Sequence, residues 1–290
     1  MRRGAWRSCQ LAPRCWDVGG RCQTVWPWHP TTTASPWGSQ DRAADLALGG
    51  QGAPLVPKAD AALLGGTKGW RALLNLGGIA NLTLIPPCCG PDRDASVQGW
   101  DCGPANSLID LAVQQFSNGT LLFDRGGAMA KAGHSDEISI RRWLQEPYFQ
   151  SPPPKSTGRE LFGRANLQQR LNDLGRDCSS QDAVATLTSF SAAVVAQDLE
   201  QLMQRDRIRP VELIVAGGGR HNPVLMDQLQ QRCRGLQLSS SQEMGLPVEA
   251  REALVFALLA WWHQRKHPAN SPSITGAHRE SVLGVLVHPG

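Results

Sequence analysis

Asp101 lies within residues 97–110, in a setting that could support acid–base chemistry. An extended apolar segment leads to it, Gly103-Pro104 follows, and the next residues have the apolar spacing of a helix. Pro104 suits the first helical position, where its missing N–H costs nothing. Asp101 would then end a strand beside an electropositive helix start, where α/β proteins bind ligands. Its carboxylate could cap the helix, which spacing alone favours, or act as a general base.

Three glycine-rich segments could bring backbone N–H groups close to a polar ligand. The first is weak evidence because most glycine-rich turns bind nothing, the second could be an ordinary hairpin turn, and the third follows a strand and precedes a helix, as in a nucleotide-binding corner. The third lacks the Gly-x-Gly-x-x-Gly spacing and the downstream acidic residue of a dinucleotide site. The segments are the loop 46–57 with Gln51 and Gly52 at its centre, the turn Gly77-Gly78, and Gly217-Gly218-Gly219.

The elements around these segments alternate between strand and helix, which predicts an α/β fold. The turn at Gly77-Gly78 joins two strands, 71–76 and 79–85, into a hairpin. A buried strand at 212–216 precedes the glycine triplet, and a helix follows from Pro223. Asp182 begins a long amphipathic helix. The last helix, 248–263, is apolar nearly all round and is expected to be deeply buried; Glu249 and Glu252 near its start would be solvated or functional.

Composition excludes several classes of function. Residues 1–42 alone carry the net charge of +4, so the remainder is neutral and offers no basic face for nucleic acid. No apolar run is long enough to span a membrane. The eight cysteines lack Cys-x-x-Cys spacing, which predicts reduced thiols, no metal site and a cytoplasmic protein. Lys155-Ser156-Thr157 resembles the end of a P-loop but lacks its glycines, so a Walker motif is rejected.

From Asp45 to Ala277 the chain resembles the anhydro-N-acetylmuramic acid kinase family of the actin, hexokinase and Hsp70 superfamily. The resemblance implies an actin/hexokinase-like ATPase fold, in which two lobes close over a cleft that holds ATP and Mg²⁺. The segments that carry it are DLALGGQGAPLVP, NLGGIANLT, GWDCGPANSLID, PYFQSPPPKSTGRELF, DAVATLT, VAGGGRHNPVLM, EAREALVFALLA and SITGA.

Such enzymes open the 1,6-anhydro ring of an amino sugar with water and phosphorylate O6, giving N-acetylmuramic acid 6-phosphate for cell-wall recycling. The resemblance implies that Asp101 is the base that activates the water. It makes Gln51, Gly52 and Glu252 sugar-binding residues. The nucleotide-binding residues that it implies are Gly77, Gly78, Asn81, Gly217, Gly218 and Gly219.

The family's first phosphate hairpin, a Gly/Thr/Ser loop followed by Asp-Gly, has no counterpart in residues 1–44. We therefore expect an atypical segment at 1–44, disordered or translated in a wrong frame, a first-lobe remnant at 45–66, and a complete second lobe at 67–290. The alternative to a kinase is an inactive one-lobe remnant that binds a nucleotide or sugar weakly. An Hsp70-like peptide-binding ATPase is disfavoured because no β-rich substrate domain follows. The family suggests a homodimer.

Overall fold

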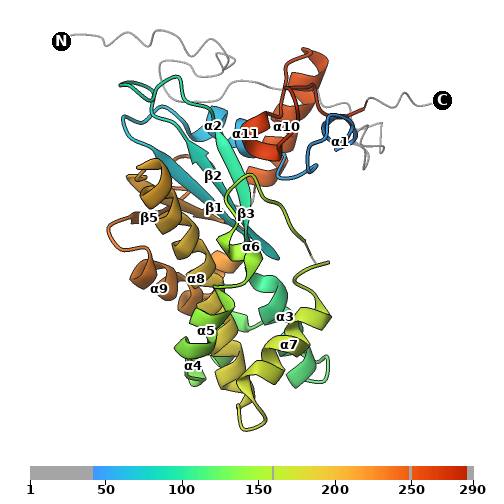
Figure 1. The fold of residues 1–290 in the computed structure, drawn as a ribbon, viewed down its shortest axis with the longest axis vertical. Helices are drawn as coiled ribbons and strands as arrows, with labels where there is room; N and C mark the ends of the chain where they lie inside the picture. Colours follow the sequence, from blue (N-terminus) through green and yellow to red (C-terminus); the bar gives the residue numbers. More distant parts are fainter. Residues whose placement is uncertain (1–41, 159, 248–249, 286–290) are drawn as a thin grey trace.

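The computed structural model describes residues 42–158, 160–247 and 250–285. Most of the predicted atypical segment at 1–44 therefore lies outside the described residues. The predicted α/β class is confirmed, because a five-stranded mixed sheet is covered by helices (Figure 1). Its strands, in the order β3-β2-β1-β4-β5, are β1 Arg71–Leu76, β2 Ile79–Ile85, β3 Gln98–Pro104, β4 Glu212–Ala216 and β5 Gln237–Ser240.

The predicted hairpin is confirmed with the bounds expected from the sequence. Strands β1 and β2 pair antiparallel around the Gly77-Gly78 turn, and β3 adds antiparallel to β2. Strands β4 and β5 extend the other side of the sheet in parallel. The register places Asn75 opposite Asn81, and Asn81 opposite Asp101. These three polar residues therefore form a row across three neighbouring strands.

The predicted boundary at Pro104 is wrong. Strand β3 continues to Pro104, and the helix α3, Asn106–Phe116, begins after Ala105, which makes no side-chain cap. A proline is tolerated here because β3 is an edge strand, on which one N–H direction needs no partner in the sheet. Asp101 thus lies within the strand, and its predicted alternative role as a helix cap is also wrong.

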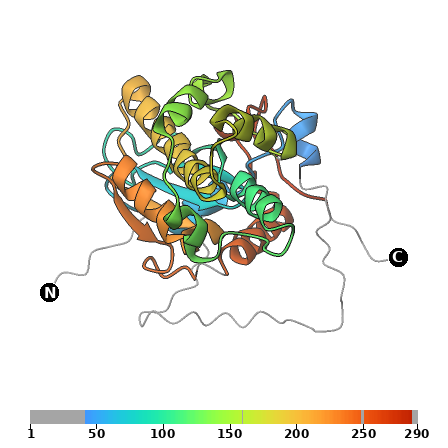
Figure 2. The ribbon, with the colours of Figure 1, turned by 90° about the horizontal axis from the view of Figure 1, so that it is seen from below.

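One face of the sheet packs against α3, α8 (Ser180–Asp206) and α9 (Pro223–Arg232). Figures 1 and 2 show α8 lying across this face. It begins two residues before the predicted Asp182, because the Ser179 hydroxyl accepts a hydrogen bond from the Asp182 N–H at 3.0 Å. Its side chains Leu187, Phe190 and Val194 are buried, each contributing about 1.5–3 kcal/mol.

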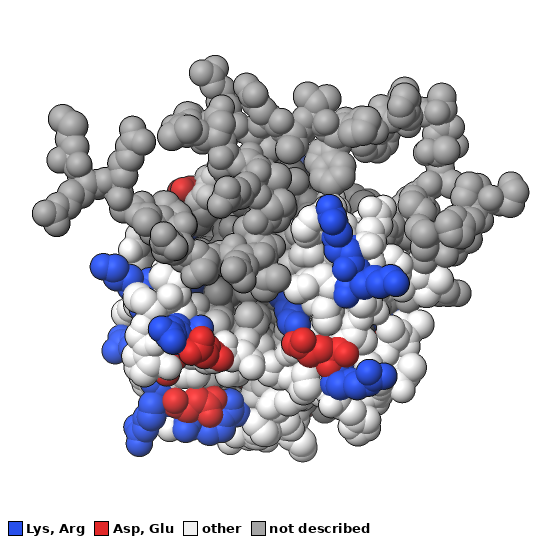
Figure 3. Space-filling model, turned by 90° about the horizontal axis from the view of Figure 1, so that it is seen from above, with Lys and Arg blue, Asp and Glu red and all other residues white. Residues whose placement is uncertain are grey.

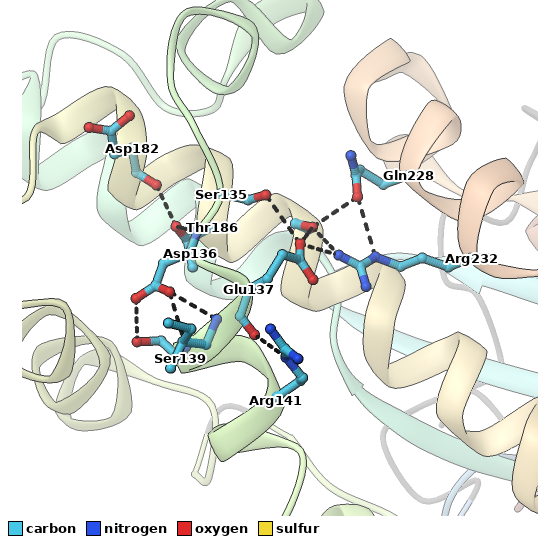
Figure 4. A network of polar contacts seen from close by, with 11 residues as sticks. Ser135, Asp136, Glu137, Ser139, Arg141, Asp182, Thr186, Gln228 and Arg232 are labelled. Atoms are coloured by element: carbon cyan, nitrogen blue, oxygen red, sulfur yellow. Dashed lines mark hydrogen bonds and ion pairs between the residues drawn. The ribbon is translucent and has the colours of Figure 1, made fainter.

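Shorter elements complete this half of the molecule. They are η1 Arg125–Gly127, α4 Ala128–Ala132, α5 Glu137–Trp143, α6 Pro147–Gln150, α7 Arg164–Leu174 and η2 Gly218–His221. Figure 4 shows the polar network that joins α5, α8 and α9. In it, the Glu137 carboxylate accepts hydrogen bonds from Arg232 at 2.5 Å and from Ser189 at 3.2 Å. The single Ser189 hydroxyl hydrogen is shared with Gln228, whose side-chain oxygen lies 2.9 Å from the hydroxyl.

The opposite face of the sheet is covered by α2, Pro57–Leu64. Helices α1 (Ala43–Ala47), α10 (Arg251–Gln264) and α11 (Pro272–Thr275) lie beside it, so the two ends of the described chain meet (Figure 1). The buried Asp45 carboxylate joins them, since it accepts hydrogen bonds from Asn270 at 2.5 Å and Thr275 at 2.6 Å. Segment 45–66 therefore packs against the C-terminal elements.

The predicted deep burial of the last helix is wrong. Only one stripe of α10 is buried, formed by Arg251, Val255, Leu259 and Trp262. Leu254 is 42% exposed, and Glu252 is exposed. An apolar composition on all sides does not determine how many sides the fold covers. Residues 248 and 249, the predicted helix start, lie outside the described residues.

On the face shown in Figure 3, basic and acidic side chains of the described residues lie beside one another. The five described cysteines are free. Among the described residues, none of the helices could span a membrane.

Candidate functional site

A cavity of about 720 Å³ lies between the sheet, the loop 46–57 and the start of α10. Four of the predicted site residues line it: Gln51, Asn81, Asp101 and Glu252. They come from segments separated by up to 201 positions in the sequence, so only the fold brings them together. A cavity of this size with a few converging polar groups is typical of a small-molecule site.

Strand alternation explains why Asn75, Asn81 and Asp101 face this cavity. Their neighbours Leu76, Leu82 and Cys102 are buried in the core on the α8 side. Successive side chains on a strand point to opposite faces. The three polar residues therefore share the face away from α8, and all three line the cavity. Asn75 was not predicted as a site residue, although the hairpin register places it opposite Asn81.

Asp101 is 5% exposed, and its carboxylate is held on one oxygen. Its Oδ2 accepts hydrogen bonds from the Ser156 hydroxyl at 2.8 Å and the Thr157 N–H at 2.9 Å. Burial raises the pKa of Asp101, and these two hydrogen bonds oppose the rise. A carboxylate with a raised pKa at the edge of a cavity is suited to taking a proton. Ser156 and Thr157 were missed as site residues.

The predicted sugar-side loop is fixed by hydrogen bonds at both of its central residues. Gly52 is buried, and its N–H donates to Asp45 Oδ2 at 2.8 Å. Gln51 donates from its N–H to the Thr275 carbonyl at 2.9 Å and from Nε2 to the Pro154 carbonyl at 3.3 Å. Gln51 lines the cavity, whereas Gly52 shapes the loop behind it. The positive φ of Gly52, 70°, suits glycine.

The start of α10 is held by a buried ion pair that the sequence did not reveal. Arg251 Nη2 lies 2.5 Å from Asp60 Oδ2, and Thr83 contacts the same oxygen at 3.5 Å. Burial raises the pKa of Asp60 to about 6 even though Arg251 lowers it. This pair fixes the next residue, Glu252, at the cavity.

Four of the five predicted nucleotide-binding glycines line two adjoining cavities instead of the Asp101 cavity, and the fifth, Gly217, lines neither. One, of about 610 Å³, contains Gly77, Gly78 and Gly218; the other, of about 520 Å³, contains Gly218 and Gly219. Both are also lined by Asn106 and Asp110. Asn81, predicted with this group, instead lines the Asp101 cavity.

The Gly77-Gly78 turn is hydrogen-bonded to the start of α3, and the glycine triplet packs closely against Leu76, just before that turn. The Gly78 carbonyl accepts the N–H groups of Ala105 at 2.9 Å and Ser107 at 3.0 Å. A Cβ at Gly217, whose φ is 85°, would lie 2.7 Å from the Leu76 carbonyl oxygen, and one at Gly219 would lie 2.7 Å from Leu76 Cβ. Gly218, by contrast, has open space where a Cβ would project.

The described residues contain no group of three or more His, Cys, Asp or Glu side chains placed to hold a metal. Mg²⁺ in phosphoryl-transfer sites is commonly held by one or two carboxylates together with substrate phosphates. Asp110 and Asp124, the carboxylates that line the cavity beside Gly218 and Gly219, fit a Mg²⁺ that is carried by a nucleotide, and the described residues form no all-protein cage.

Solved structures give only distant likenesses. Xylulose kinase from Rhodospirillum rubrum is 14% identical with a TM-score of 0.41, over 72% of this chain and 48% of that chain. The activator of 2-hydroxyisocaproyl-CoA dehydratase from Clostridium difficile, with bound ADPNP, is 13% identical with a TM-score of 0.38, over 73% and 65%. Neither contributes to the family assignment.

Sequence matches are far stronger. The model of the anhydro-N-acetylmuramic acid kinase family matches residues 32–289. Relatives with that name are 85% identical in Synechococcus sp. (strain CC9902), over 98% of this chain and 80% of the relative, and 71% identical in Synechococcus sp. (strain CC9605), over 86% and 65%. A Prochlorococcus marinus (strain MIT 9303) relative is 67% identical, again over 86% and 65%. The chain belongs to the anhydro-N-acetylmuramic acid kinase family.

Proposed function

We propose that this protein is an ATP-dependent kinase that opens the anhydro ring of anhydro-N-acetylmuramic acid and phosphorylates O6. One observation carries the proposal: the fold gathers Asp101, Gln51 and Glu252 around one cavity. These are the residues that the family resemblance assigns to water activation and sugar binding. The product, N-acetylmuramic acid 6-phosphate, would serve cell-wall sugar recycling in the cytoplasm.

The chemistry requires a base on the side of the sugar that water attacks. In the proposed step, water attacks the anomeric carbon, its proton passes to Asp101, and the bond from that carbon to O6 breaks. O6 accepts the γ-phosphoryl group of ATP, so the products are the 6-phosphate and ADP. Asp101 suits this role because burial raises the pKa of its carboxyl toward the range in which a base is most effective.

The glycine turns fit the nucleotide. Gly217 and Gly219 allow the chain to pass against Leu76, and Gly218 faces open space beside Gly77 and Gly78. Phosphate groups accept hydrogen bonds from backbone N–H groups in such turns. We assign ATP to the two cavities that share Gly218, of about 610 and 520 Å³. Mg²⁺ would be bound there through the phosphates of the nucleotide. Charge neutralisation there would assist phosphoryl transfer.

A second function is binding without turnover. The chain spans 80% of the length of its Synechococcus sp. (strain CC9902) relative and 65% of the other two, so the activity of those longer proteins is itself a proposal here. A coupled ADP-release assay with the anhydro sugar, combined with calorimetric titration of each ligand, separates the two functions. Sugar-dependent ADP release supports the kinase. Binding of either ligand without ADP release supports the second function.

We also propose that the protein is a homodimer, as the family resemblance suggests. Its sedimentation in solution tests this proposal.

A further inference from the structure

The loop 152–158 runs beside the edge strand β3 and connects the two faces of the sheet. The N–H of Asp101 donates to the Lys155 carbonyl at 2.9 Å, so the loop pairs with the strand at the level of the candidate base. Lys155 reaches Asp198 on α8, whereas the next residue, Ser156, bonds the Asp101 carboxylate on the cavity side. Adjacent residues of this loop therefore reach opposite faces of the sheet.

Lys155 and Asp198 form an ion pair buried beneath the candidate site. Lys155 Nζ lies 2.9 Å from Asp198 Oδ1, with side-chain exposures of 6% and 5%. Trp100, the residue before Asp101, donates from Nε1 to the other Asp198 oxygen at 2.8 Å. The pair is thus tied to β3 on the same level as Asp101.

Tyr148, on α6, makes a further contact with β3 beside the Lys155–Asp198 pair. Its hydroxyl donates to the Asp101 carbonyl at 2.8 Å, and Lys155 Nζ lies 5.2 Å from the centre of its ring. The backbone of Asp101 is therefore held by contacts from α6 and from the loop 152–158, on the side away from the cavity. Among the described residues, the hydrogen bonds to its carboxylate reach Oδ2, and none reaches Oδ1.

A buried ion pair is a poor source of stability, because desolvation of both charges offsets their attraction. Burial raises the pKa of Asp198, while Lys155 and Trp100 lower it, which is consistent with this offset. What the pair does supply is a fixed position for the loop, because a charge-assisted hydrogen bond joins Lys155 to one oxygen on α8 at a defined distance and direction. Fixed orientation of a reacting group has a large effect on rate.

We propose that Lys155 and Asp198 are positioning residues, which fix the loop so that Ser156 and Thr157 hold Asp101 Oδ2 and leave Oδ1 facing the cavity. This inference rests on the proposed role of Asp101 as the base. Neither side chain lines the cavity, so their action on the reaction is through the loop.

The test is the double variant Lys155→Met/Asp198→Asn. Replacing both partners leaves no unpaired buried charge and keeps the net charge unchanged, and Asp198→Asn retains an oxygen that can accept from Trp100. A matched control is Arg232→Met, which breaks the half-buried ion pair with Glu137, a contact outside the cavity lining. Thermal unfolding identifies variants that are folded at the assay temperature. Lys155→Met alone serves as a comparison in which Asp198 keeps a buried charge.

Two readouts are measured on each folded variant: steady-state kinetics, and titration of the Asp101 side chain by carbon NMR, with its signal assigned through Asp101→Asn. Loss of the two hydrogen bonds to the ionised form should raise the pKa of Asp101 by about one unit in the double variant. We expect kcat to fall about 10- to 100-fold and KM to change less than about threefold. The control should retain the wild-type titration and kcat.

An unchanged Asp101 titration in a folded double variant would overturn the positioning role. The same conclusion would follow if the control shifted Asp101 equally, since the effect would then reflect general stability. The NMR titration does not depend on turnover. If wild-type protein shows no turnover but the double variant shifts Asp101, the proposed function fails, whereas the control of the Asp101 carboxylate by Lys155 and Asp198 is confirmed.

Discussion

Asn81 lies directly opposite Asp101 across strands β2 and β3, and both side chains line the same cavity. Opposed residues in antiparallel strands have Cβ atoms about 4.5–5.5 Å apart. A neutral amide therefore stands next to the candidate base, where a second carboxylate would repel it. The ionisation of Asp101 should depend on the residue at position 81.

The variant Asn81→Asp tests this relationship. A second carboxylate would disfavour ionisation of Asp101 and raise its pKa further. Because a base works only when ionised, the acid side of the pH profile of kcat/KM should move to higher pH, by about one unit. Asn81→Ser, which adds no charge, is the control. Identical profiles for the two variants would contradict the prediction.

The glycine triplet offers a pair of substitutions with opposite expectations. Gly219→Ala would place a Cβ 2.7 Å from Leu76 Cβ, so it should lower the free energy of unfolding by about 1–3 kcal/mol. Gly218→Ala meets no neighbour and should leave the melting temperature unchanged. If the triplet binds ATP, Gly218→Ala should still weaken nucleotide affinity, measured by calorimetry. Unaltered affinity would argue against the assigned nucleotide site.

The raised pKa of Asp60 predicts that the free energy of unfolding depends on pH. Its pKa is about 6 in the folded protein, above the ordinary value of 3.8. Its contribution to stability is therefore full below about pH 4 and is lost as the pH rises through about 6, by about 2–3 kcal/mol. Chemical denaturation at pH 4.5 and 7 should show a smaller difference for Asp60→Asn than for wild type. Equal differences would exclude Asp60 as the source.

Glu252 is exposed at the cavity, so its effects on stability and binding should separate. Glu252→Gln should change the free energy of unfolding by less than about 0.5 kcal/mol, because the side chain is not buried. If Glu252 contacts the sugar, KM for the sugar should rise about 10-fold or more, as expected from loss of a charged hydrogen bond. Glu280→Gln, which affects an ion pair with Lys58 outside the cavity lining, is the control. A normal KM would remove Glu252 from the sugar site.

Sequence patterns a few residues long correctly predicted those elements whose ends are set by residues close to them in the sequence. The Gly77-Gly78 hairpin, strand β4 and the start of α9 at Pro223 all have the predicted bounds. The end of β3 was misplaced because Pro104 favours a helix start only if the strand has already ended. Its tolerance within the strand depends on β3 being at the edge of the sheet, which is a property of the whole topology.

The candidate site likewise contains residues that the sequence identifies and residues that only the fold brings together. Asp101 was identified from its surroundings and from the family resemblance, whereas its hydrogen-bond donors were not. Ser156 and Thr157 lie 55 and 56 positions further along the chain, in a segment that carries the family resemblance but to which no site residue was assigned. Nothing local shows that this loop pairs with β3. Arg251 was missed for a similar reason, since its partner Asp60 is 191 positions away.

The most direct test of the central claim is turnover of anhydro-N-acetylmuramic acid and ATP in ¹⁸O-labelled water, by wild-type protein and by Asp101→Asn. We predict that wild type forms a sugar 6-phosphate carrying one labelled oxygen at the anomeric carbon. Asp101→Asn should still bind the sugar but form product at least about 100-fold more slowly, the usual contribution of a general base. Product formed at the wild-type rate by Asp101→Asn, or product without the label, would contradict the account.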